Sequence, residues 1–371
     1  MEELLIKEIK QQRNYGIDLL RLISMFMVVV LHVLGQGGIL NNTQPLSVKS
    51  EIFYFLDITC YCSVNVFAII SGFVGLKAKH RYSNLINLSL QLIFYAVLLT
   101  GIETIVLVYL GKDISINNVV LNLFPSVHSI WYFSAYFCLF FFMPILNSII
   151  ENTPRNALKV GAVFVFIIFC RFGQVSTKVV NLSNGYSVLW LAILYLLGAY
   201  MTKYELLKLS PVKCLIGFLS CVVLTSISRI VFGNISRIVF DEVGRGTNLL
   251  ISYTSPTILL SAIFLVGLFM KIKIRDKAKK VIAFLSPMAF GVYLIHCNPI
   301  IFERLAKVFS WVALEPIYLG PFIAMGIALI IFASCLFIDW IRLLLFKVCK
   351  VKKFSVWIEN LFRKMFTKIF M

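Results

Sequence analysis

Ionisable side chains inside long apolar segments are few in this sequence. They are functional candidates, because placing them in hydrocarbon is costly. The set comprises Asp18, Arg21, His32, Glu103, Arg171, Arg229, His296, Asp339 and Arg342. Most lie near segment ends, where long side chains can reach the polar boundary, but His32, Glu103 and His296 do not. We interpret Glu103, which has no evident partner, as a protonated core carboxyl; the alternative is a group that lines the same cavity as the histidines.

Arg21 and His32 are placed to act on one helix face. Their separation of eleven residues corresponds in a helix to about 1100°, about 20° from whole turns, and to about 16 Å along the axis. Asp18, Met25 and Val28 fall on the same face, so this stripe would run from a charged cytoplasmic mouth to an imidazole deep in the membrane. The alternative is that Arg21 reaches the headgroups and His32 only hydrogen-bonds a neighbouring helix.

His296 is expected at a similar depth, because each histidine lies 15 residues past the start of its apolar segment. Pro287 and Pro299 flank it and can open the local hydrogen-bond ladder to make room for a site. A histidine is the usual general base for a hydroxyl near neutral pH. The sequence contains no Gly-x-Ser-x-Gly, paired-carboxylate, zinc or P-loop pattern.

The composition places these residues in a membrane. Of the 371 residues, 60% are hydrophobic and 14% charged, with a mean hydropathy of +0.91; soluble domains have about 45–50% and about 25%. An ordinary soluble enzyme, a disordered chain and a disulfide scaffold are thereby excluded. We attribute the net charge of +18 to basic loops that fix topology, and not to nucleic-acid binding. The nine cysteines mostly lie in apolar runs, and we interpret them as small core residues.

The apolar segments predict an all-α, polytopic membrane protein with about ten transmembrane helices. The expected spans are 17–37, 52–76, 84–110, 129–150, 157–173, 186–202, 211–232, 248–270, 281–303 and 317–339. Two of them, 157–173 and 211–232, end early at Arg171 and Arg229 and could be half-buried or broken helices. With a cytoplasmic N-terminus, the inside segments hold 24 Lys and Arg and the outside segments nine, which supports both termini inside.

We expect one membrane-embedded domain, 1–346, followed by a tail, 347–371. In the tail, apolar residues recur at helical spacing with Arg363, Lys364 and Lys368 between them, which predicts a basic amphipathic helix on the inner membrane surface. No internal repeat marks the two halves of a transporter.

Four segments, in order, resemble the acyltransferase-3 family of membrane-bound enzymes that O-acylate bacterial surface polysaccharides. They are Tyr15 to His32 with its Arg-x10-His pattern, Ser63-Val-Asn-Val-Phe67 with Ser71-Gly-Phe73, Ser129-Ile-Trp131-Tyr-Phe followed by Met143-Pro144, and Ser286 to His296, which resembles Ser-x-x-Ser-Phe-Gly-x-Tyr-Leu-x-His. Arg-x10-His alone is a weak signal. The ordered set is specific, and it extends over about 280 residues.

The resemblance implies a cytoplasmic acyl-CoA donor, usually acetyl-CoA, and a carbohydrate acceptor on or near the outer face. His32 would be the catalytic base, or a transient acyl carrier, and His296 a second catalytic histidine. Arg21 would help to hold the anionic end of the donor. Some relatives carry an aspartate three residues after the first histidine; here that residue is Gly35, so another group must orient the imidazole.

The resemblance also points to residues outside the stripe. Arg81, with Lys79, is the nearest match to family arginines that follow Ser-Gly-Phe, and is a candidate contact for CoA phosphates. Ordinary positive-inside charge would explain it equally well.

Three residues are candidate contacts for the acceptor, namely Asn65, His128 and Trp131. His128 lies three residues before Trp131 at the expected outer mouth, and Trp131 would anchor the interface or shape the sugar entrance. Asn65 could bind the substrate or a neighbouring helix. Ser71-Gly72 favours close helix packing over nucleophilic catalysis.

We therefore predict a bacterial plasma-membrane O-acetyltransferase that uses acetyl-CoA and acts on a cell-surface or lipid-linked saccharide. We expect membrane lipids as partners, and no nucleic acid, metal or permanently bound cofactor. The rival prediction is a transporter or flippase of a lipid-linked oligosaccharide, which would also be polytopic and basic inside. A transporter would not need paired histidines above a basic mouth, and would more often have repeated halves.

Overall fold

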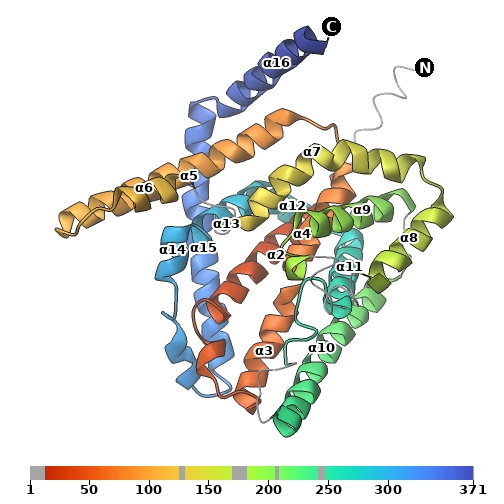
Figure 1. The fold of residues 1–371 in the computed structure, drawn as a ribbon, viewed down its shortest axis with the longest axis vertical. Helices are drawn as coiled ribbons and strands as arrows, with labels where there is room; N and C mark the ends of the chain where they lie inside the picture. The colour runs from red at the N-terminus through yellow and green to blue at the C-terminus, as the bar shows by residue number, and fades with distance from the viewer. Residues whose placement is uncertain (1–12, 125–129, 169–181, 205–208, 241–246, 371) are drawn as a thin grey trace.

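The computed structural model describes residues 13–124, 130–168, 182–204, 209–240 and 247–370, in which all regular elements are helices (Figure 1). The helices are α2 (Tyr15–Leu34), α3 (Val48–Tyr61), α4 (Ser63–Gly75), α5 (Tyr82–Tyr109), α6 (Ile116–Leu123), α7 (Trp131–Asn152), α8 (Arg155–Ile167), α9 (Val188–Tyr204), α10 (Pro211–Phe240), α11 (Pro256–Lys271), α12 (Asp276–Leu285), α13 (Ala289–His296), α14 (Pro299–Arg304), α15 (Gly320–Val348) and α16 (Val351–Phe370). The expected all-α class is confirmed.

Seven helical stretches among the described residues are long and apolar enough to cross a membrane. They are Tyr15–Leu34, Val48–Gly75, Tyr82–Tyr109, Trp131–Asn152, Pro211–Phe240, Asp276–His296 and Gly320–Val348. Two more expected spans correspond to shorter apolar helices, α9 with 17 residues and α11 with 16. The expected span 157–173 begins in α8 and continues outside the described residues. The protein is thus a multi-pass membrane protein, while ten spans and cytoplasmic termini stay predictions.

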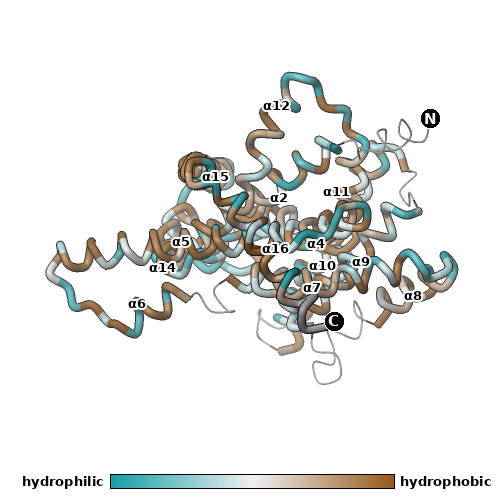
Figure 2. Tube along the Cα trace, turned by 90° about the horizontal axis from the view of Figure 1, so that it is seen from above, coloured by the Kyte–Doolittle hydropathy of each residue, from teal (hydrophilic) through white to brown (hydrophobic). Residues whose placement is uncertain are grey.

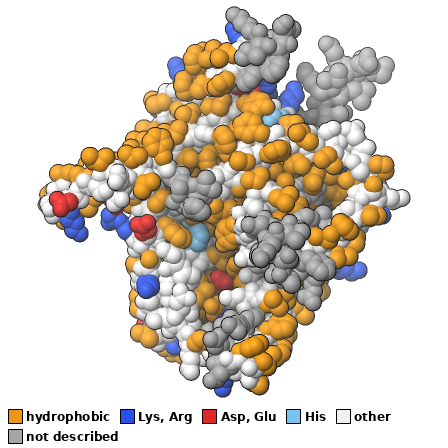
Figure 3. Space-filling view, in the orientation of Figure 1, with side chains coloured by type: hydrophobic (Ala, Val, Ile, Leu, Met, Phe, Trp, Pro, Cys, Tyr) orange, Lys and Arg blue, Asp and Glu red, His pale blue; other side chains and the backbone are white. Residues whose placement is uncertain are grey.

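The outer surface suits a lipid environment. Figure 3 shows hydrophobic side chains spread over much of the face in view, and many large apolar residues of α5, α10 and α15 are exposed. Figure 2 shows hydrophilic residues gathered at the turn that leads into α12, within the lysine-rich stretch 271–280. Exposed apolar area on this scale is typical of a bilayer-facing surface.

Helix α2 is the most enclosed of the candidate spans. Within its apolar window 72% of the residues are buried, compared with 17% in α5 and in α15. Asn14 fixes its start: Oδ1 accepts hydrogen bonds from the N–H groups of Gly16 and Ile17 at 3.0 and 3.2 Å, and Nδ2 donates to Met270 O at 3.1 Å. A Cβ on Gly16 would overlap the carbonyl of Phe269. These contacts clamp α2 to the end of α11, and so fix the position of the stripe that starts at Arg21.

Helices α4 and α9 approach each other through glycine. A Cβ on Gly72 would overlap the carbonyl of Tyr195, and one on Gly198 the carbonyl of Ile69. The close packing predicted for Ser71-Gly72 is confirmed. The Ser71 hydroxyl donates to Phe67 O at 2.8 Å within its own helix.

Helix α10 corrects the expectation that Arg229 ends its apolar stretch. The helix continues without a break from Pro211 to Phe240. Arg229 is only 4% exposed; its Nε lies 3.2 Å from Glu51 Oε2 and its Nη1 3.0 Å from Asn248 Oδ1. Because these partners satisfy the guanidinium, the charge is buried inside the bundle and the helix need not stop.

Glu103 also differs from its expected state as an unpartnered core carboxyl. Its Oε1 lies 3.1 Å from Arg304 Nη2, and its Oε2 accepts from Asn122 Nδ2 at 3.3 Å. These contacts tie α5 to α14 and α6 (Figure 1). Glu103 is therefore an ion-paired structural residue, and it does not line the large cavity described below.

The tail forms the predicted helix, α16, which packs against α5. Glu359 Oε2 accepts a hydrogen bond from the N–H of Ser83 at 3.1 Å, and Glu359 Oε1 pairs with Arg363 at 2.9 Å. The N-cap residue of α5, Arg81, makes no side-chain hydrogen bond to the start of that helix. A carboxylate from another helix is favourable there, because it meets the positive end of the helix dipole.

Candidate active site

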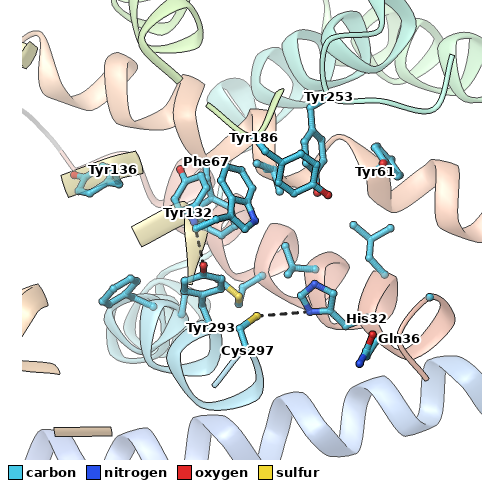
Figure 4. A pocket seen from close by; sticks show the side chains of 18 of the residues that line it. His32, Gln36, Tyr61, Phe67, Tyr132, Tyr136, Tyr186, Tyr253, Tyr293 and Cys297 are labelled. Carbon is cyan, nitrogen blue, oxygen red and sulfur yellow. Dashed lines mark hydrogen bonds between the residues drawn. The ribbon is translucent and has the colours of Figure 1, made fainter. Parts of the chain in front are cut away.

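A cavity of about 750 Å³ brings the predicted stripe to one wall. Arg21, Met25, Val28 and His32 all line it, as their helical spacing predicts. Other walls come from α3, α4, α7, α13 and segment 247–255; Figure 4 shows many of the side chains. A cavity of this size can enclose a small-molecule substrate.

His32 and His296 are in direct contact. His32 Nδ1 lies 3.1 Å from His296 Nε2, and the ring centroids are 5.1 Å apart. His296 is 1% exposed, while His32 borders the cavity and packs edge-on against Phe302, 5.0 Å away between ring centroids. The prediction that the two imidazoles lie at similar depth is confirmed.

The hydrogen bonds of this pair assign its tautomers. His296 Nδ1 lies 2.6 Å from Val292 O, and a carbonyl oxygen only accepts, so Nδ1–H donates. In the neutral ring, His296 Nε2 is then an acceptor, and His32 Nδ1–H donates to it. His32 Nε2 is left with a free lone pair. Figure 4 shows this nitrogen on the side of the ring that faces the tyrosines.

Cys297 completes a group of three potential metal ligands. Its Sγ lies 3.7 Å from His32 Nδ1, the contact drawn in Figure 4, and 3.3 Å from His296 Nε2. The three atoms lie within 4.8 Å of one another. Three His and Cys ligands with one open position would suit zinc. The sequence predicts that the cysteines are small core residues, but Cys297 lines the cavity.

The Arg21 end of the cavity is positively charged. Arg21 Nη1 lies 3.1 Å from Asp18 Oδ1, and Arg13 pairs with the other oxygen of Asp18. Arg13 Nη2 also donates to the cavity-lining Ser286 at 3.1 Å. Two guanidinium groups share one carboxylate, so this end suits an anionic group.

The other end of the cavity, hereafter the aromatic end, is lined by Tyr54, Asp57, Tyr61, Trp131, Tyr186 and Tyr253. Trp131 thus lies in the cavity wall, 4.6 Å from Tyr186 between ring centroids. Sequence reasoning missed the four tyrosines and Asp57. Tyr54, Asp57 and Tyr61 share one face of α3 at positions i, i+3 and i+7. No spacing pattern links that face to Tyr186 or Tyr253.

Asn65 supports the aromatic end from behind. It is 0% exposed, its Nδ2 donates to Tyr253 O at 2.8 Å, and its Oδ1 accepts from Trp190 Nε1 at 3.0 Å. Of the two roles considered for Asn65, the structure shows bonding to neighbouring segments. Because Asn65 does not line the cavity, we do not propose it as a substrate contact.

The segment from Ser286 to His296 is held on two sides. The N–H of Tyr132 donates to Tyr293 Oη at 3.2 Å, which joins α13 to α7. On the other side, a Cβ on Gly291 would overlap the Asp339 carboxylate. Asp339 is fully buried and accepts from Tyr95 at 2.6 Å and from Arg342 Nε at 3.0 Å. The glycine of this motif therefore lets α13 approach a buried ion pair.

The remaining candidates lie elsewhere. Lys79 and Arg81 are exposed in the turn between α4 and α5 and do not line the cavity. His128 lies outside the described residues.

Comparison with known proteins matches residues 14–340 to the family model described as an acyltransferase domain. No curated protein and no solved structure gives a significant match. The match covers all four motifs and all the residues that line the cavity. The chain, a multi-pass membrane protein, therefore belongs to the acyltransferase-3 family.

Proposed function

We propose that this protein is a bacterial plasma-membrane O-acetyltransferase. It transfers the acetyl group of acetyl-CoA to a hydroxyl of a cell-surface or lipid-linked saccharide, with His32 as general base. The observation that carries this proposal is the hydrogen-bonded pair of His32 and His296 in the wall of a large cavity.

In the proposed reaction, His32 Nε2 removes the proton of the acceptor hydroxyl as that oxygen attacks the thioester carbonyl. The tetrahedral intermediate then collapses, the C–S bond breaks, and the leaving thiolate takes the proton back from His32. The acetyl ester and CoA thiol are the products, and His32 returns to its neutral state. Proton transfer of this kind contributes about 10²–10⁴-fold to a rate.

In this proposal His296 orients the imidazole of His32, which is the role of an aspartate in some relatives. Its Nδ1–H is held by Val292 O at 2.6 Å, so its Nε2 keeps accepting from His32 Nδ1. This contact fixes the ring orientation of His32 and stabilises the imidazolium that forms in the reaction. Because Gly35 stands where some relatives have an aspartate, no carboxylate is available there, and His296 takes its role.

We assign the donor to the Arg21 end. Its excess positive charge suits the anionic part of CoA, and the stripe of Met25 and Val28 offers an apolar path for the pantetheine arm to His32. Lys79 and Arg81 remain proposed contacts of the CoA phosphates outside the cavity. Trp131 remains a proposed contact of the acceptor.

The test is the O-acetyl content of surface polysaccharide, measured by proton NMR. Cells with the gene deleted are compared with cells complemented by the wild type, by His32→Ala or by Ile23→Ala. Ile23 lies on α2 but not in the cavity wall, so its variant controls for general weakening of that helix. We expect acetyl signals with the wild type and Ile23→Ala only. Unchanged acetylation with less exported polysaccharide after deletion would overturn the proposal in favour of a transporter or flippase.

A further inference from the structure

The aromatic end of the cavity contains a connected cluster of rings. Tyr253 lies 5.1 Å from Tyr61, 5.1 Å from Tyr186 and 6.3 Å from Trp131 between ring centroids. Figure 4 shows Tyr186 and Tyr253 side by side with their hydroxyl groups close together. These residues present both apolar faces and polar hydroxyls to the cavity. A sugar ring has the complementary pattern, with C–H faces that stack on aromatic rings and hydroxyls at its edge.

The carboxyl of Asp57 belongs to the same aromatic end of the cavity. Asp57 is 6% exposed and lines the cavity. Within the described part of the chain, its carboxyl makes no hydrogen bond and no ion pair. The neighbouring Glu51 is ion-paired with Arg229, which also donates a hydrogen bond to Asn248. A buried carboxyl without a hydrogen-bond partner is costly, which points to a ligand that donates to it.

The two ends of the cavity differ in charge. Arg21 lines the cavity together with Tyr132 and Tyr136, whereas Asp57 lies on α3 with Tyr54 and Tyr61. Arg229 is ion-paired with Glu51, so the carboxyl of Asp57 makes the aromatic end unfavourable for an anion, in contrast to the Arg21 end.

We infer that Asp57, Tyr61, Trp131, Tyr186 and Tyr253 form the acceptor subsite, in which Asp57 accepts hydrogen bonds from the hydroxyls of a non-acidic sugar ring stacked on the aromatic cluster. This inference rests on the proposed function and deepens it. The subsite lies in the same cavity as His32, so a sugar bound there would share that cavity with the proposed base.

The test separates acceptor from donor kinetics. Membranes that contain the wild type, Asp57→Asn or Tyr186→Ala receive labelled acetyl-CoA and graded amounts of polysaccharide purified from the deletion strain, which lacks the modification. Tyr186 is 47% exposed, so its truncation leaves the packing of the bundle largely intact. Size-exclusion elution of each solubilised variant checks its folding.

For both variants we expect the KM for polysaccharide to rise about tenfold or more, because each loses a contact with the bound acceptor. The KM for acetyl-CoA should stay within about twofold, because the donor end is untouched. An unchanged KM for polysaccharide in both variants would overturn the inference, and so would an acetylated residue that NMR identifies as an acidic sugar. Absence of any transfer by the wild type would instead count against the proposed function.

Discussion

His296 accepts a hydrogen bond from His32 at 3.1 Å, and the carbonyl of Val292 fixes the direction of that bond. The pair therefore has a defined polarity, with its free lone pair on His32 Nε2. This relationship assigns different parts to two histidines that the sequence presents as equivalents. His32 would touch the reacting hydroxyl, and His296 would position His32.

This polarity predicts unequal effects of substitution. His32→Ala should lower kcat by about 10²–10⁴-fold, the usual contribution of a general base. His296→Ala should lower kcat less and leave the KM for acetyl-CoA unchanged, while His296→Gln, which keeps an acceptor, should recover part of the loss. The measurement is steady-state transfer by membranes matched for protein content. An equal loss of kcat in both alanine variants, with no recovery in His296→Gln, would contradict distinct roles for the two histidines.

Zinc should inhibit the enzyme. A zinc ion held by His32 Nδ1, His296 Nε2 and Cys297 Sγ would use the Nδ1 lone pair of His32. The remaining proton of that ring would then lie on Nε2, and the base would be lost. We expect a chelator to leave transfer unchanged, added Zn²⁺ to reduce it, and Cys297→Ser to weaken the reduction. Loss of transfer with the chelator and its recovery with Zn²⁺ would instead make the metal part of the mechanism.

Arg21→Gln should affect the donor alone. Removing one of the two guanidinium groups around Asp18 leaves this end of the cavity neutral, so the KM for acetyl-CoA should rise about tenfold. The KM for polysaccharide serves as the internal control and should not change. An unchanged KM for acetyl-CoA would place Arg21 outside the donor contacts.

Gly291→Ala should destabilise the protein by about 1–3 kcal/mol, a typical cost of overpacking. The added methyl would overlap the Asp339 carboxylate and push α13 away from α15. Gly101→Ala is the matched control, because it also lies inside a helix and has nothing within 4 Å of the added Cβ. Thermal unfolding in detergent measures both variants, and equal midpoints would show that α13 is not held by this contact.

Docking of α16 on α5 should weaken in acid. Burial by itself would raise the pKa of Glu359, but hydrogen bonds from Ser83 and Arg363 outweigh it and hold that pKa below the ordinary value of 4.5. The ionised group therefore stabilises docking fully above pH 4.5, and this contribution is lost as the pH falls below that value. Hydrogen exchange of the α16 amides should accelerate at low pH in the wild type. Glu359→Gln should already exchange faster at pH 7, and identical exchange in both proteins would contradict the contact.

Local sequence patterns determined much of this protein. Hydropathy over windows of about 20 residues marks the apolar helices, because a bilayer demands that length of chain. Helix periodicity alone placed Arg21 and His32 on one face, since residues eleven apart return to the same side. The ordered motifs identified the family.

Only the tertiary structure decided the partners of the buried groups. The partner of Glu103 lies 201 residues away, at Arg304, and that of Arg229 lies 178 residues away, at Glu51. Local sequence shows neither partner, so it predicts an unpaired carboxyl at Glu103 and a helix end at Arg229. The hydrogen bond between His32 and His296 bridges 264 residues, and Trp131, Tyr186 and Tyr253 line the same cavity as Asp57 from separate later segments. Such contacts leave no periodic signal, because they depend on how helices pack and not on how each one winds.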